Sequence, residues 1–207
     1  MFPNHEIQKA LLPYGVPTAP EACEAIRKYI ALLIHWNQKV SLTTVILPSE
    51  ILRFHFGESL FAIPIVPILQ GRLADVGSGA GFPGIPIGIV VPDIHVTLIE
   101  SNVKKATFLA EVQRELKLAN VEIFRGRMED LPPSVAKFDF VTARALGKQR
   151  ELLTWSKEHL DIGGKVVLWS GGGDVELLTR HLGWNWHKPH LIPGSKRRFL
   201  LFGSPAD

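Results

Sequence analysis

The segment DVGSGAGFPG, from Asp75 to Gly84, is the part of the sequence that decides the fold. It follows a short apolar strand predicted over residues 72–76. Glycines alternate at Gly77, Gly79 and Gly81, where backbone without side chains can turn tightly and allow a ligand to approach closely. This arrangement is typical of the first strand-to-helix turn of an open parallel sheet, where such folds bind their ligands.

Strand and helix signals alternate along the rest of this body. Apolar residues at helical spacing predict helices over residues 104–118 and 151–160. Short β-branched or apolar runs predict further strands at residues 96–100, 121–124, 138–142, 165–170 and 197–202. The alternation predicts an α/β fold with a mostly parallel, doubly wound, Rossmann-like sheet.

The first seventy residues are predicted to be helical. An apolar stripe at three- and four-residue steps predicts a strong helix from Pro20 onward, and a weaker helix is expected over residues 50–59. Prolines and a glycine within residues 63–71 then break the pattern. We therefore expect an N-terminal helical segment, residues 1–70, packed on a main domain, residues 71–207.

The composition excludes several classes of protein. Of 207 residues, 46% are hydrophobic and 21% charged, which is typical of a globular chain with a substantial core. The start of the chain does not have the pattern of a signal peptide, and no apolar run approaches the roughly 20 residues of a membrane span. Cys23 is the single cysteine, and the histidines lack metal-ligand spacing. We expect a cytoplasmic monomer without a metal or a membrane partner.

Basic residues gather in the second half of the chain, although the net charge is only +3. Clusters of this kind can bind nucleic acid or can be ordinary solvated surface. The candidates for RNA contacts are Lys148, Arg150, Lys196, Arg197 and Arg198. Trp184 and Trp186 are the best candidates for stacking on bases.

The ligand of the glycine-rich turn is either a nicotinamide dinucleotide or S-adenosylmethionine. Glu100 follows the turn by about 20 residues, and a carboxylate there accepts hydrogen bonds from ribose hydroxyls of either molecule. Asp75, the additional Gly77, and Glu129 with Asp130 after the third strand favour the methyl donor. Arginines 125 and 127 on the same approach leave a phosphate ligand open.

Several motifs together resemble one family, the bacterial small-subunit (16S) ribosomal RNA guanine-N7 methyltransferases, also called glucose-inhibited division protein B or RsmG. The resemblance covers most of the chain and differs from the usual family pattern at Ser41, Glu58 and Ser170. The motifs are WNQKVSLT at residues 36–43, HFGESL at 55–60, DVGSGAGFPGIP at 75–86, KKATFL at 104–109, GRMED at 126–130 and TARAL at 142–146.

The resemblance implies a class I methyltransferase fold, S-adenosylmethionine as cofactor, and 16S ribosomal RNA or the small ribosomal subunit as partner. It also implies a role for Arg144, which we expect to position the cofactor carboxylate or the guanine O6 edge. The alternative for this arginine is a structural ion pair at the sheet edge. Implied cofactor contacts, in addition to Asp75 above, are Gly77, Gly79, Phe82, Glu100, Ser101, Asn102, Met128 and Glu129.

Three functional classes remain open from the sequence. The first is an RNA methyltransferase, with a methyltransferase for another RNA or a small molecule as its variant. The second is a nicotinamide-dependent oxidoreductase. The third is a noncatalytic RNA-binding protein that keeps the fold. The loose glycine spacing and the acid at Glu100 fit the first two equally well, and Asp75, Gly77 and the family resemblance favour the first.

Overall fold

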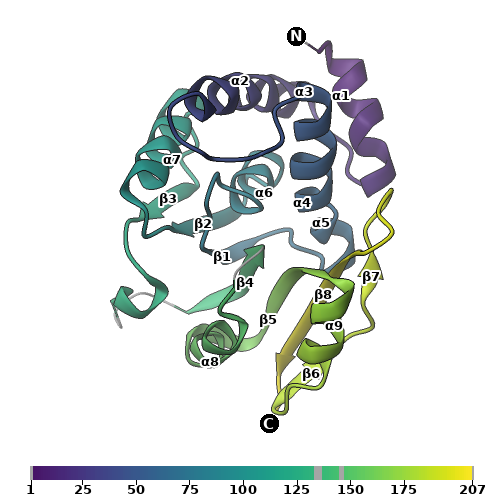
Figure 1. The fold of residues 1–207 in the computed structure, drawn as a ribbon, viewed down its shortest axis with the longest axis vertical. Coiled ribbons are helices and arrows are strands. Elements are labelled where there is room, and N and C mark those ends of the chain that lie inside the picture. The colour runs from purple at the N-terminus through teal and green to yellow at the C-terminus, as the bar shows by residue number, and fades with distance from the viewer. Residues whose placement is uncertain (1, 133–136, 145–146, 207) are drawn as a thin grey trace.

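A central sheet covered by helices on both faces forms the body of the molecule in the computed structural model, which describes residues 2–132, 137–144 and 147–206 (Figure 1). Positions 145 and 146 of the TARAL motif lie outside the described residues. The strands are β1 (Gly71–Val76), β2 (Ile94–Ile99), β3 (Val121–Phe124), β4 (Phe138–Arg144), β5 (Leu160–Gly171), β6 (Trp184–Trp186), β7 (His190–Leu191) and β8 (Arg198–Pro205).

The strand order is β3-β2-β1-β4-β5-β8-β6, and β7 pairs with β8. Strands β1 to β5 pair in parallel, whereas β8 runs antiparallel to β5. The order reverses between β1 and β4, so the carboxyl ends of these two strands flank the place where open α/β sheets bind ligands. The predicted mostly parallel, doubly wound sheet is confirmed.

The helices follow the apolar patterns of the sequence but are more numerous than predicted. Those of the N-terminal segment are α1 (Asn4–Leu11), η1 (Leu12–Tyr14), α2 (Pro20–Asn37), α3 (Pro48–Glu50), the π-helical turn η2 (Ile51–Gly57), α4 (Glu58–Leu60) and α5 (Ala62–Ile65). Those of the body are α6 (Gly84–Val90), α7 (Val103–Leu116), η3 (Met128–Asp130), α8 (Gln149–His159) and α9 (Gly172–Thr179).

Two apolar clusters fill the spaces between the layers. The larger one joins the N-terminal helices, α6 and α7 to one face of the sheet, and the smaller one lies under α8 and α9 on the other face (Figure 1). Tyr29 from α2 and Leu73 from β1 belong to the same cluster. The N-terminal segment and the main domain thus share one core. The division of the chain into two parts at residue 70 stays a prediction.

Some elements differ from the sequence prediction for identifiable reasons. Strand β5 begins at Leu160, which pairs with Phe138 of β4, and a register irregularity before Lys165 accommodates Gly163, whose φ is 79°. The last strand is antiparallel, which the strand propensity of its residues could not show. Among the described residues, no helix combines the length and apolar character needed to cross a bilayer, and no cluster of His, Cys, Asp or Glu side chains is arranged for a metal ion.

Candidate cofactor and acceptor site

The glycine-rich turn leaves β1 at Val76 and adopts the backbone conformation that its glycines predicted. Gly77, Gly79 and Gly81 have φ angles of 69°, 59° and 87°, a region that L side chains rarely occupy. The amide of Gly77 donates to the carbonyl oxygen of Ile99 at 2.9 Å, so the turn is tied to the end of β2. Beyond the ends of β1 and β2, Gly77 is exposed and Gly79 is half-buried.

Asp75 supports the turn through buried hydrogen bonds. Its side chain is fully buried, and it accepts hydrogen bonds from the Thr142 hydroxyl at 2.9 Å and the Gly84 amide at 3.1 Å. Burial raises the pKa of Asp75 to about 7, and the bonds from Thr142 and Gly84 act in the opposite direction. The structure thus places this carboxylate in a supporting position between β1, β4 and the start of α6.

Glu100 faces the turn directly. Its carboxylate accepts hydrogen bonds from the amide of Gly79 at 2.8 Å and from the amide of Asn102 at 2.7 Å. The Asn102 side chain in turn accepts from the Lys105 amide at 3.2 Å and caps α7. The acid predicted to lie opposite the glycines is therefore held rigidly beside them.

A cavity of about 250 Å³ opens beside this turn, at the carboxyl ends of β1 and β2. Four sequence candidates line it, and Glu100 with Gly79 and Asn102 forms the adjoining hydrogen-bonded corner. Two basic lining residues, Arg127 and Lys148, have no cofactor role in the sequence prediction. The lining residues are Val76, Gly77, Ile99, Ser101, Gly126, Arg127, Met128, Glu129 and Lys148.

Phe82 lies apart from this cavity. Its ring packs against Tyr29 and Phe56 and stacks on His55 with a centroid distance of 4.5 Å. The Tyr29 hydroxyl donates to the carbonyl oxygen of Ala80, so α2 is bonded to the turn itself. These contacts make the N-terminal helices a support for the glycine-rich turn, whereas a cofactor contact by Phe82 stays a prediction.

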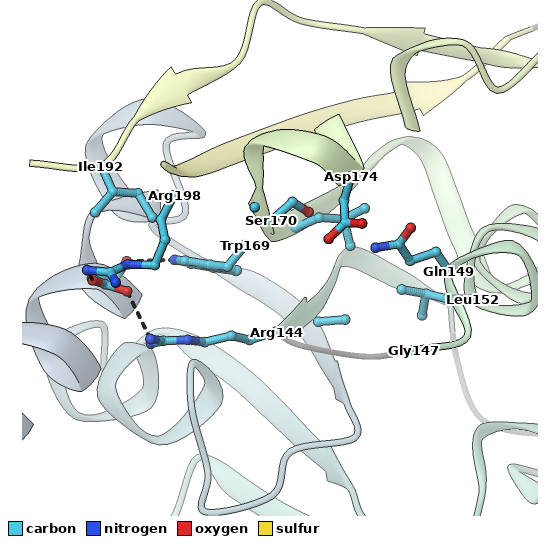
Figure 2. A pocket seen from close by; sticks show the side chains of 13 residues that line it. Arg144, Gly147, Gln149, Leu152, Trp169, Ser170, Asp174, Ile192 and Arg198 are labelled. Carbon is cyan, nitrogen blue, oxygen red and sulfur yellow. Dashed lines mark hydrogen bonds and ion pairs between the residues drawn. The ribbon is translucent and has the colours of Figure 1, made fainter. Parts of the chain in front are cut away.

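A second, larger cavity of about 530 Å³ lies at the carboxyl ends of β4 and β5 (Figure 2). Gly147 lines this cavity and its chain neighbour Lys148 lines the first, so adjacent residues of the chain reach the two cavities. The side chains shown in Figure 2 include Arg144, Gln149, Trp169, Asp174 and Arg198.

Arg144 is engaged in an ion pair in this structure. Its guanidinium contacts the Glu58 carboxylate at 2.9 Å and donates to the carbonyl oxygen of Phe54 at 2.8 Å. Arg198 contacts the second carboxylate oxygen of Glu58 at 2.6 Å. The indole of Trp169 donates to the Glu58 carbonyl oxygen at 2.7 Å. The ion-pair alternative for Arg144 is thus observed, while the same side chain also lines the second cavity.

Burial works against the charges of this cluster. The Glu58 side chain is 1% exposed, and burial raises the pKa of its carboxyl while the guanidinium groups of Arg144 and Arg198 oppose that shift. Burial likewise lowers the pKa of Arg144, and Glu58 opposes that shift. Sequence patterning could not identify this pairing, because Glu58 and Arg144 lie 86 residues apart.

The basic candidates for RNA contacts occupy several positions around the two cavities. Lys148 lines the first cavity and Arg198 the second, while Lys196 and Arg197 are exposed just before β8 and Arg150 is exposed at the start of α8. The sequence did not indicate Arg53, an exposed residue of η2 whose guanidinium lies 3.4 Å from the Gly194 carbonyl oxygen.

The tryptophan candidates for base stacking lie elsewhere. Trp184 is buried in β6 and stacks on Trp186 with a centroid distance of 5.7 Å. Strand β6 is at the far edge of the sheet, whereas Trp169 lines the second cavity. Of these three side chains, Trp169 is therefore the one beside the candidate site.

Comparison with known proteins gives consistent matches. A family model described as GidB, rRNA small subunit methyltransferase G, matches residues 22–181. A protein of Pseudomonas syringae pv. syringae named ribosomal RNA small subunit methyltransferase G is 36% identical over 206 residues, covering 96% of this chain and 94% of that protein. One of the same name from Chromobacterium violaceum is 34% identical over 194 residues and covers 91% of each chain.

Solved structures show the same fold at low sequence identity. A ribosomal protein L11 methylase from Lactobacillus delbrueckii subsp. bulgaricus superimposes with a TM-score of 0.61 at 16% identity, covering 75% of this chain and 80% of that one. A SAM-dependent methyltransferase from Aquifex aeolicus gives a TM-score of 0.58 at 17% identity, covering 68% and 86%. The expected class I methyltransferase fold is confirmed by these neighbours.

Proposed function

The chain belongs to the rRNA small subunit methyltransferase G family, and we propose that it transfers a methyl group from S-adenosylmethionine to N7 of a guanine in 16S ribosomal RNA. The observation that carries the proposal is the corner where the Glu100 carboxylate meets the Gly79 amide, beside the cavity at the ends of β1 and β2. Family membership favours methyl transfer over hydride transfer, because the glycine spacing alone fits both.

The residues of the first cavity suit the parts of S-adenosylmethionine. Each carboxylate oxygen of Glu100 accepts one backbone hydrogen bond, and each has lone-pair capacity left for a ribose hydroxyl. The buried Met128 offers an apolar surface to the adenine ring, and Glu129 offers an acceptor for its amino group. The exposed backbone at Gly77 leaves room for the remainder of the molecule.

The chemistry requires positioning and no proton transfer. The cofactor supplies a methyl group on a positively charged sulfur. Guanine N7 has an in-plane lone pair that forms the new N–C bond while the S–C bond breaks, and the positive charge passes from sulfur to the purine. The protein's task is to hold the nitrogen in line with the methyl group, which can lower the barrier by several kcal/mol. No general base is required.

The exposed basic residues fit RNA phosphates. Lys148, Arg150, Lys196 and Arg197 are all exposed, and Lys148 lines the first cavity. The side chain of Arg198 is 47% exposed and forms an ion pair with Glu58, so it is the candidate least available to an RNA phosphate. Phosphate contacts of this kind make affinity fall steeply as salt rises. We further propose that the protein acts as a cytoplasmic monomer, without a metal, on the small-subunit RNA or on the subunit itself.

Methyl transfer to small-subunit ribosomal RNA tests the function. Purified protein is incubated with tritiated S-adenosylmethionine and either the RNA or the small subunit from cells lacking the protein, and mass spectrometry maps the product. We expect one N7-methylguanine. Calorimetry should detect binding of S-adenosylmethionine and no binding of a nicotinamide dinucleotide. Transfer to no ribosomal RNA, or binding of the dinucleotide instead, would contradict the proposal.

A matched pair of variants tests the cofactor site. Glu100→Gln removes the negative charge at the turn and should weaken S-adenosylmethionine binding about 10-fold, which is the loss of a charged hydrogen bond. Glu122→Gln changes an exposed acid in β3 that bonds Thr97 and lines neither cavity. It should bind the cofactor as the unchanged protein does. Equal binding by all three proteins would remove Glu100 from the cofactor site.

A further inference from the structure

The second cavity has the position and size of a site for the methyl acceptor. It lies at the carboxyl ends of β4 and β5, and its lining residue Gly147 is the chain neighbour of Lys148 in the first cavity. Its volume of about 530 Å³ is within the range of small-molecule sites. A base held there would lie next to a cofactor held in the first cavity, as methyl transfer requires.

The charged and amide side chains of this cavity fall into two sets on opposite sides (Figure 2). One set is the ion-pair cluster, in which Glu58 is bonded to Arg144 and Arg198. The other set is Asp174, in the first turn of α9, with Gln149 at the start of α8. In Figure 2 the Trp169 ring lies between the two sets.

Asp174 and Gln149 are available to a ligand. Within the described part of the chain, neither side chain has a hydrogen-bond or ion-pair partner, whereas the Glu58 carboxylate is fully engaged. The cavity therefore offers one unengaged carboxylate and one unengaged amide on the wall opposite the arginines. A carboxylate accepts two parallel hydrogen bonds when a ligand presents two adjacent N–H donors.

Guanine presents that pair of donors. Its N1–H and its exocyclic N2 amino group lie side by side on the Watson–Crick edge, and N7 lies on the other edge of the purine. Building on the function proposed above, we propose that Asp174 selects guanine by accepting hydrogen bonds from N1–H and the N2 amino group, assisted by Gln149. The N7 edge then faces away from Asp174 and stays free to meet the methyl group of the cofactor.

The same carboxylate favours the reaction electrostatically. Methylation at N7 places a positive charge on the purine, and this charge makes N1–H a stronger donor. A fixed negative group at the Watson–Crick edge therefore stabilises the transition state and product more than the neutral base. Asp174 is a specificity-determining residue that lowers the barrier without moving a proton.

The test must separate this role from a structural one, because an acid in the first turn also stabilises a helix. Once the methylated guanine has been mapped in the unchanged protein's product, small-subunit RNA is prepared with guanosine or inosine at that position. Inosine keeps N7, O6 and N1–H but lacks the N2 amino group. Asp174→Asn keeps the size of the side chain, and Glu176→Gln is the control in the same helix, where Glu176 pairs with Arg180 at the surface.

The unchanged protein and Glu176→Gln should both methylate the guanosine RNA about 10- to 100-fold more efficiently in kcat/KM than the inosine RNA, the effect of one charged hydrogen bond. Asp174→Asn should lose activity toward guanosine and prefer it by less than about threefold. If Asp174→Asn keeps the full preference, the inference is wrong although the proposed function stands. If the unchanged protein methylates no small-subunit RNA, the proposed function and this inference both fail.

Discussion

The buried Glu58 carboxylate joins three parts of the chain, and its removal should destabilise the fold measurably. It lies in α4, while its partners Arg144 and Arg198 come from β4 and β8. Glu58→Gln preserves the shape of the side chain and removes its charge. Arg144, whose side chain is only 19% exposed, is then left with the Phe54 carbonyl oxygen and an amide in place of a carboxylate.

The two pairs should contribute unequally to this loss. Breaking a buried ion pair by removing one partner costs about 3–5 kcal/mol. Arg198 is 47% exposed and can turn toward water, so the loss comes mainly from Arg144. The glutamine oxygen still accepts a hydrogen bond, which favours the lower end, about 3 kcal/mol. For a chain of this size such a loss lowers Tm by roughly 6–12 °C.

Urea denaturation followed by circular dichroism at pH 7 measures the effect. The midpoint should fall while the slope of unfolding free energy against urea stays constant. Glu176→Gln serves as the control, because its pair with Arg180 is at the surface, with side chains 69% and 74% exposed, and should cost about 0.3–0.5 kcal/mol. If Glu58→Gln lowers the free energy of unfolding by no more than this control does, the ion pairs of Glu58 do not stabilise the fold.

Two further predictions concern the glycine-rich turn. Burial raises the pKa of Asp75 to about 7 in the fold, above its ordinary value of 3.8, so the folded state binds this proton more tightly than the unfolded state does. The stability that the protonated acid contributes is therefore lost as pH rises from about 4 through 7. Asp75→Asn lacks this loss, so its urea midpoint relative to the unchanged protein should rise over that range; a difference independent of pH would contradict it. Gly79→Ala should cost about 1–2 kcal/mol at a φ of 59° and also weaken S-adenosylmethionine binding in calorimetry. Gly163→Ala, at a φ of 79° in open space away from both cavities, should cost similar stability without changing binding, and equal binding by both variants would remove Gly79 from the site.

The sequence predicted the turn and its acid because both depend on local chemistry. Alternating glycines require positive φ angles, and the end of a neighbouring parallel strand brings Glu100 to the turn. Gly77, Gly79 and Glu100 therefore lie as expected. The choice of ligand proposed for them needed the family resemblance, because the same spacing serves two cofactors.

The second cavity could not be predicted, because it depends on tertiary contacts between distant segments. Asp174 is an ordinary acid in the sequence, and only the packing of α9 against β5 places it beside Trp169. The tryptophans of β6 were favoured for stacking on residue type alone, although antiparallel pairing with β8 carries them to the sheet edge. Pairings over long sequence separations leave no periodic pattern.

Residues of the N-terminal helices reach the surroundings of the first cavity and the lining of the second. Tyr29 of α2 bonds the glycine-rich turn beside the first cavity, and Glu58 of α4 lines the second. If Arg144 were to contact a ligand, it would have to do so while sharing Glu58, because an unpaired guanidinium at this depth is costly. Glu58 therefore fixes where that charge can act. Glu58→Gln should therefore displace the Arg144 side chain before it weakens cofactor binding. The corner that we propose for the cofactor, at Glu100, has none of these contacts.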